Sequence, residues 1–273
     1  MKKLAYILPF IFLFTPLLAS ASCAITYQGK VVDGFGTAPS PMFSNVPIGT
    51  ASSNRRVLIA IIGNASYTAL GLTDITVNGT SVGSNYIAVQ GGTSWQREVL
   101  WAWADVPTGT TANVDVTYTT SPNGYGTWIA EAYTFDNTQC ASAPTHHENT
   151  NTSNTTISNQ IATQAKGFLV GIAATYALTS TSNFVVSASD ETLNNNDVLN
   201  GGPGLQISSK TSSTASSASS NITWTWTTAV TSFSSMLFWG PAPATAPAPA
   251  RKMRLFEGFK IKLISWKMIL YQQ

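Results

Sequence analysis

The chain has 273 residues, of which 44% are apolar, 11% aromatic and only 10% charged, with a formal net charge of +2. Enough apolar and aromatic side chains are present to fill a large core, which excludes wholesale disorder. The net charge combines unlike segments, because residues 22–250 carry six basic and eleven acidic side chains and residues 251–273 carry six basic and one acidic. Since the long central segment is mildly acidic, we expect no nucleic-acid partner.

The first 21 residues have the pattern of a secretory signal peptide. Lys2 and Lys3 precede an apolar run that ends in the small residues 19–21, which is the order expected before a cleavage site. The alternative is an uncleaved membrane anchor, but the run is only just long enough to cross a bilayer and contains two prolines. We therefore expect a signal-peptide helix at 1–21, a secreted or extracellular surface protein, and no membrane span after cleavage.

The chain has two cysteines, Cys23 and Cys140. If the chain is exported, they can form a disulfide, because disulfides persist in oxidising compartments. A bond between them would join the new N-terminus to the middle of the chain. Two alternatives remain open: both thiols are unpaired, or Cys23 is acylated as in bacterial lipoproteins. Ser20 stands where the lipoprotein signal usually has leucine, so cleavage after Ala21 is favoured.

Residues 22–240 are expected to form one all-β domain, because apolar and polar residues alternate between turn residues. The continuous apolar run 55–63 predicts a strand buried on both faces. Residues 73–83 predict a hairpin that turns at Asn78 and Gly79. Further strands are expected in 97–106, 112–120 and 127–136. In the first of these, Val99, Trp101 and Trp103 share one face, whereas Leu100, Ala102 and Ala104 share the other.

The second half repeats this order of segments. Strands are expected at 166–176, 204–211, 221–230 and 232–240, and the segment 145–159, rich in asparagine, threonine and serine, is expected to connect the halves. The halves are either a duplicated sheet unit or the two facing sheets of a sandwich. Since nothing helical separates the strands, we expect an antiparallel β-sandwich of the jelly-roll or Ig-like type with about ten or more strands.

The order of the segments 55–63, 75–82, 99–119 and 128–137 resembles a loosely defined, functionally uncharacterised group of β-sandwich domains in secreted bacterial and phage-encoded surface proteins. The resemblance covers roughly residues 50–240. It implies the sandwich fold and a structural or binding role at a surface or on a virion. The group has no defined catalytic residues, so it implies none for this chain.

Residues of catalytic or metal-binding type are few. His146, His147 and Glu148 are the one cluster of metal-ligand type, but adjacent histidines in extended chain point in different directions, so we expect no metal and no cofactor. Hydrolysis of a glycoside needs two carboxylates around the bond. The available acids show no spacing that singles out a pair: Glu98, Asp105, Glu131, Asp136, Asp190 and Glu191. No G-x-S-x-G motif is present, so we do not expect an enzyme.

The tryptophans Trp101, Trp103, Trp224 and Trp226 suggest a second kind of site. Within each pair the residues are two apart, so both share one face of a strand. If these faces point outward, they form a platform on which sugar rings stack. If they point inward, the tryptophans belong to the core, which large aromatics usually dominate.

Beyond residue 240 the composition changes. Residues 241–250 form a Pro/Ala linker, and residues 251–273 form a basic, apolar tail in which alternation predicts two short strands. A lone hairpin is marginal in water, so we expect the tail to dock to a protein partner, to another copy or to an anionic membrane surface. The expected docking residues are Phe256, Phe259, Ile261, Leu263, Trp266, Met268 and Leu270.

Together these features predict an exported, non-catalytic surface, virion-associated or assembly protein whose tail docks to a partner. The alternative is a secreted carbohydrate-binding module or a glycan-active hydrolase, for which a glycan would be the ligand.

Overall fold

The computed structural model describes residues 22–34, 42–64, 71–91, 97–119, 127–175, 185–188, 219–243, 259–264 and 267–272. Within these ranges the regular structure consists of β-strands, and the strand pairs are antiparallel. This confirms the all-β prediction. The chain divides into two units, residues 1–242 and 243–273. The signal peptide and the strand expected at 204–211 lie outside the described residues.

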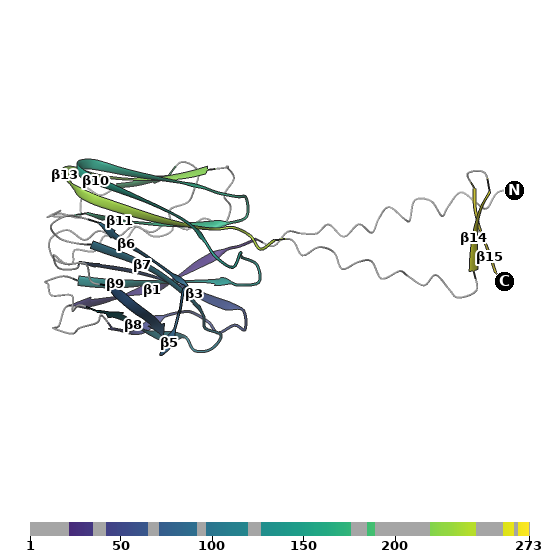
Figure 1. The fold of residues 1–273 in the computed structure, drawn as a ribbon, viewed down its shortest axis with the longest axis horizontal. Coiled ribbons are helices and arrows are strands. Elements are labelled where there is room, and N and C mark those ends of the chain that lie inside the picture. Colours follow the sequence, from purple (N-terminus) through teal and green to yellow (C-terminus); the bar gives the residue numbers. More distant parts are fainter. Residues whose placement is uncertain are drawn as a thin grey trace. The chain divides into compact units, whose positions relative to one another are not determined.

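The first unit is layered like a sandwich (Figure 1). Its central sheet has the strand order β1-β9-β3-β7-β6. These strands are β1 (Ile25–Gly34), β3 (Arg55–Asn64), β6 (Tyr86–Gly91), β7 (Arg97–Asp105) and β9 (Thr127–Asp136). The β8 sheet covers one face of the central sheet, and the β13 sheet covers the other.

The β8 sheet has the order β2-β8-β4-β5. Its strands are β2 (Met42–Pro47), β4 (Leu72–Val77), β5 (Thr80–Ser81) and β8 (Thr111–Tyr118). The hairpin between β4 and β5 turns at Asn78 and Gly79, both of which have positive φ angles of 52° and 73°. That conformation is the one a type I′ turn requires, which confirms the predicted hairpin.

Strand β3 is buried on both faces, as its continuous apolar sequence predicts. Ile59 and Ile61 pack in the core shared with the β8 sheet. Leu58 and Ile62 pack in the core shared with the β13 sheet. Within the sheet, β3 pairs β7 along one edge and β9 along the other, so both its faces and both its edges are covered.

The β13 sheet is built on a long ribbon of two strands, β10 (Thr145–Ala162) and β13 (Ser219–Trp239), which pair along their length. The register shifts between Asn151 and Thr156, and the two halves of β13 have different second partners. Strand β11 (Phe168–Thr175) pairs one half, and β12 (Val185–Ala188) pairs the other. The halves pack on each other through a third core of buried residues: Ile157, Ile161, Leu169, Ala173, Ile222, Trp224, Trp226, Met236 and Phe238.

Two predictions for this region are wrong. Residues 145–159 do not connect two halves but form most of strand β10. Residues 221–230 and 232–240 are not separate strands but lie in one strand, β13. The segment 145–159 reads as a loop because it is polar, yet its threonines are β-branched and suit an extended backbone. Its hydrogen bonds come from β13, a partner more than sixty residues away that local sequence does not reveal.

The start and end of the first unit meet at Cys140. Cys23 and Cys140 form a disulfide with their Cα atoms 4.8 Å apart, and both are buried. Cys140 also forms an isolated β-bridge with Pro241, and the backbone N of Ala242 donates to the carbonyl of Gln139 at 2.8 Å. The chain therefore enters and leaves this unit at one anchored point.

The second unit contains strands β14 (Phe259–Ile264) and β15 (Lys267–Gln272), which pair with each other. The register sets Ile261 opposite Leu270 and Leu263 opposite Met268. Phe256 and Trp266, the other aromatic residues expected to dock, lie outside the described residues. Among the residues that the structure describes, no helix is long and apolar enough to cross a membrane.

Candidate functional site

The four tryptophans of the predicted platform lie in the core. Their exposed fractions are 0% for Trp101, 5% for Trp103, 0% for Trp224 and 4% for Trp226. Trp101 and Trp103 point from β7 toward the β13 sheet, where Trp103 meets Trp239 edge to face at 5.3 Å between ring centroids. Because all four rings are buried, the second alternative holds for the described structure: these tryptophans belong to the core and form no exposed platform.

A buried polar junction joins the central sheet to the β13 sheet. The indole Nε1 of Trp101 donates a hydrogen bond to Oγ of Ser235 at 2.7 Å. Nε2 of His146 lies 3.1 Å from the same oxygen. Burial lowers the pKa of His146, an effect that the nearby Glu148 carboxylate opposes. Because Ser235 is fully buried and already accepts the indole hydrogen, this trio links two sheets and does not present a nucleophile.

His147 points to the other side of β10 and joins the two halves of the ribbon. Its Nδ1 is hydrogen-bonded to Oδ1 of Asn159, and Nδ2 of Asn159 donates to the carbonyl of His147 at 3.2 Å. The two adjacent histidines therefore serve different interfaces, as expected for extended chain. Within the described ranges, no group of three or more His, Cys, Asp or Glu residues could hold a metal ion.

The two buried carboxylates of the central sheet cannot act on one bond. Glu98 accepts a hydrogen bond from the hydroxyl of Tyr118 at 2.5 Å, and Glu131 accepts one from Tyr133 at 2.7 Å. Tyr118 belongs to the core with the β8 sheet and Tyr133 to the core with the β13 sheet, so the acids lie on opposite faces. Burial and the adjacent Glu98 raise the pKa of Tyr118 far above its ordinary value, which keeps this hydroxyl a donor.

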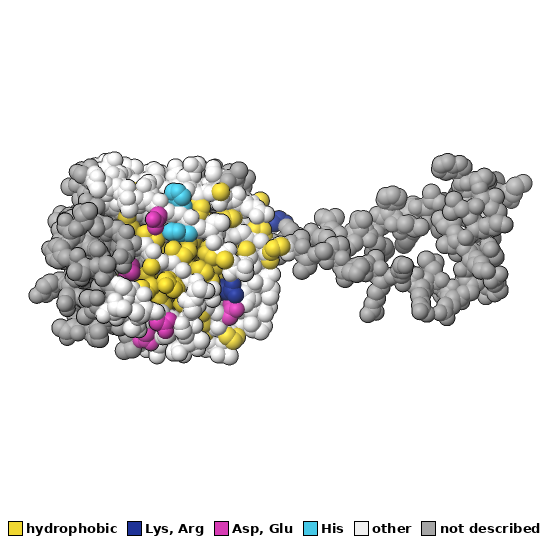
Figure 2. All heavy atoms as spheres, in the orientation of Figure 1, with side chains coloured by type: hydrophobic (Ala, Val, Ile, Leu, Met, Phe, Trp, Pro, Cys, Tyr) yellow, Lys and Arg dark blue, Asp and Glu magenta, His cyan; other side chains and the backbone are white. Residues whose placement is uncertain are grey.

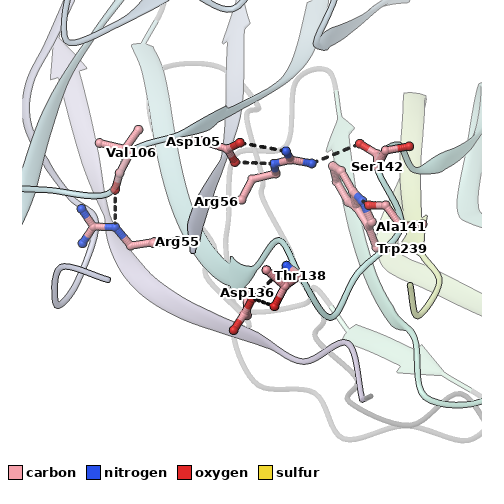
Figure 3. Close-up of polar contacts among 9 residues, drawn as sticks. All are labelled: Arg55, Arg56, Asp105, Val106, Asp136, Thr138, Ala141, Ser142 and Trp239. Atoms are coloured by element: carbon pink, nitrogen blue, oxygen red, sulfur yellow. Dashed lines mark hydrogen bonds and ion pairs between the residues drawn. The ribbon is translucent and has the colours of Figure 1, made fainter. Parts of the chain in front are cut away.

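Two further acids have structural partners (Figure 3). Asp105 receives two hydrogen bonds from Arg56, at 2.7 and 3.0 Å, and these bonds lower its pKa. Asp136 accepts from both the backbone N and the hydroxyl of Thr138, at 2.8 and 2.6 Å, and so holds a turn. The remaining candidates, Asp190 and Glu191, lie outside the described residues. Each of the four described candidate acids thus has a structural partner, and Glu98 and Glu131 do not flank one space as a glycosidase pair would.

Arg55 is a buried cation that sequence reasoning missed. Only 4% of it is exposed, and its guanidinium donates five hydrogen bonds to backbone carbonyls at 2.7–3.0 Å: those of Ile48, Gly49, Val106, Thr108 and Gly109. A planar group with five donors suits such a ring of carbonyls. Arg55 therefore fastens two loops beside the start of β3, and the pair Arg55-Arg56 in the sequence gives no sign that the two differ.

No protein-family model, curated protein or solved structure matches this chain.

The surface feature that stands out is the edge of the central sheet at β6. Its residue Tyr86 is 37% exposed, and Ala88 beside it is exposed too, whereas Val89 is buried. Figure 2 shows hydrophobic side chains gathered in the middle of the face that carries the histidines, with acidic side chains above and below them. We call strand β6, Tyr86–Gly91, with its outward main chain the β6 edge.

Proposed function

We propose that this protein is an exported, non-catalytic surface, virion-associated or assembly protein, whose layered body is a structural or binding module and whose C-terminal unit docks to a partner. One observation carries the proposal. The candidate catalytic side chains that the structure describes are engaged in hydrogen bonds that hold sheets and turns together, while β14 and β15 form a separate unit.

The composition of the C-terminal segment supports docking. A sheet of only two strands is marginal in water, and β14 and β15 pair only with each other among the described strands. Residues 251–273 carry six basic side chains and one acidic, opposite in sign to the rest of the mature chain. A partner with an acidic, partly apolar surface would stabilise this unit.

Export is supported by two features that agree. The N-terminal sequence has the pattern of a signal peptide, which would direct the chain to an oxidising compartment, and a disulfide such as Cys23–Cys140 persists in such a compartment. A sulfur held in that disulfide is not available for acylation, which favours ordinary cleavage after Ala21 over a lipid anchor. We also propose a finer fold assignment. The layered body would be a jelly-roll or Ig-like sandwich of ten or more strands, related to the β-sandwich domains of secreted bacterial and phage surface proteins.

The carbohydrate-binding alternative loses its main support, because the rings of Trp101 and Trp224 are fully buried. Stacking on a sugar needs an exposed aromatic face, and neither ring offers one.

The test compares the mature chain, residues 22–273, with a chain that ends at Pro243. We expect both to be folded, because the disulfide and the β-bridge at Pro241 are present in each. Sedimentation velocity over a range of concentrations should show the shorter chain as a monomer and the longer chain associating. A full-length variant Ile261→Asp should behave like the shorter chain. Identical sedimentation of all three would refute docking by the C-terminal unit.

A further inference from the structure

Most strand edges of the first unit are protected against pairing with another chain. Natural sheets protect their edges with bulges, charges, proline or very short strands. In β1 the register shifts near Gly29 and Lys30 follows, β2 ends at Pro47, and β10 carries Glu148. Strand β5 is two residues long and β12 four. Strand β11 is buried from Phe168 through Ala173.

The β6 edge has none of these protections. Its sequence, YIAVQG, contains no charged residue and no proline. Its pairing with β7 runs without a register shift, and Tyr86 and Ala88 are exposed. Among the described strands of the first unit, it is therefore the edge best suited to accept a further strand.

The hydrogen bonds of β6 show which of its main-chain groups face outward. The backbone N of Trp103 donates to the carbonyl of Asn85 at 3.0 Å, so residues 85 and 103 are a hydrogen-bonded pair. Such pairs alternate along an antiparallel ladder. The N–H and C=O groups of Tyr86, Ala88 and Gln90 therefore point away from β7, spaced to bond a new strand.

The charges around this edge indicate what would pair with it. Ile87 of β6 pairs with Trp101, whose indole shares the hydroxyl of Ser235 with His146, and the Glu148 carboxylate of β10 acts on that histidine. Strand β5, five residues before β6, holds a second acid, because Ser81 donates to the carboxylate of Asp74 at 2.6 Å. A complementary strand would be apolar with regularly spaced cations. Strand β14 has this sequence, FKIKLI, in which Lys260 and Lys262 alternate with apolar residues.

We propose that the β6 edge binds strand β14 of a second copy of this chain, so that copies join head to tail. This inference rests on the proposed docking function and names the partner and its surface. The charges favour a copy of this chain as the partner, because residues 251–273 are basic and residues 22–250 are acidic. Pro-rich spacers such as residues 241–250 are extended and semi-rigid, so we expect the tail to meet a second copy more readily than its own. A heterologous contact of this type produces rings or open filaments, or a closed dimer when two copies exchange their tails.

The decisive variant is Ala88→Pro in the full mature chain. Proline removes the outward N–H of residue 88 and places its ring in the path of an added strand, while the bonds from β6 to β7 use other residues. We expect the self-association constant to fall about tenfold or more. The matched control is Ala88→Val, which keeps the N–H and should associate like the wild type. Lys260→Glu with Lys262→Glu should weaken association as well.

A second measurement does not depend on how Ala88→Pro folds. Amide hydrogen exchange of the wild-type chain should show residues 86, 88 and 90 exchanging rapidly when dilute and slowly when associated. In Ile261→Asp they should exchange rapidly at every concentration. Protection that does not change with concentration would indicate pairing within one copy and would overturn the inference.

The outcomes separate this inference from the proposed function. If Ile261→Asp abolishes association but a folded Ala88→Pro associates like the wild type, the C-terminal unit docks elsewhere and the β6 edge is not its site. If Ile261→Asp associates like the wild type, docking by the C-terminal unit is itself wrong. A wild-type chain that remains monomeric at all concentrations overturns both.

Discussion

The indole of Trp101 in β7 donates a hydrogen bond to the hydroxyl of Ser235 in β13, 134 residues further along the chain. This bond crosses the core between the central sheet and the β13 sheet. It explains why a tryptophan on an alternating strand faces inward here: its ring fills the core and its one polar group has a buried partner. An aromatic residue with that arrangement stabilises the layers and cannot bind a ligand.

Removing the Ser235 hydroxyl should show how much this junction contributes to the free energy of unfolding. Ser235→Ala leaves the indole N–H of Trp101 buried with its acceptor removed, so we expect a loss of about 1–3 kcal/mol in the free energy of unfolding. Denaturation in urea measures it. Ser142→Ala, at an exposed serine, is the control and should change stability by less than about 0.5 kcal/mol. Equal effects of the two substitutions would mean that the junction contributes no more than a surface contact.

The same junction should make stability depend on pH. Burial lowers the pKa of His146 below its ordinary value of 6.5, so just below that pH the unfolded chain binds a proton that the folded chain does not. Stability is therefore complete at neutral pH and falls as the pH drops through about 6.5 toward the folded-state pKa.

Thermal unfolding between pH 7.5 and 5 tests this dependence. The wild type should lose thermal stability over that interval, and His146→Gln, which has no titratable group, should lose less. Asp105 does not contribute to the change in stability over this pH interval. Its lowered pKa stabilises the fold above pH 3.8, and that contribution disappears only in more acidic solution. Equal slopes for wild type and His146→Gln near pH 6 would contradict the assignment.

The adjacent arginines should respond very differently to substitution. Arg55→Lys keeps the charge but cannot reproduce five hydrogen bonds to carbonyls, so we expect a loss of about 2–4 kcal/mol. Arg56→Lys alters a partly exposed ion pair with Asp105, worth about 1 kcal/mol or less. Urea denaturation of both variants provides the comparison, and a larger effect at Arg56 would reverse our ranking.

The disulfide should contribute strongly to stability. Cys23 and Cys140 are 117 residues apart, and the chain-entropy model assigns a loop of that length about 5 kcal/mol as an upper figure. Replacing both cysteines with serine should lower the urea midpoint markedly. Because both residues are buried, a reductant should open the bond in the native protein far more slowly than in urea. Rapid reduction of the native protein would show that the bond is accessible.

The first half of the fold could be predicted because its signals are local. Strand β3 is apolar at every position from Val57 to Ile62, and the turn at Asn78 and Gly79 has a sequence that specifies its geometry. Alternation also assigned the faces of β7 correctly, since Val99 and Leu100 belong to different cores. Each of these features depends on neighbours within a few residues.

The rest depends on distant contacts. Strand β10 is polar, and only its pairing with β13 makes it a strand. Alternation placed Trp101 and Trp103 together on one face but did not show whether that face is buried, because its burial depends on a strand more than a hundred residues further along the chain. Arg55 could not be distinguished from Arg56 because its carbonyl partners come from two separate loops.

We propose above all that the C-terminal unit joins the layered body to a partner. The most direct measurement is the weight-average mass of the mature chain, residues 22–273, as concentration rises, with Ile261→Asp alongside. We expect a mass that increases with concentration for the wild type and remains that of one chain for Ile261→Asp. Superimposable curves for the two proteins would contradict it.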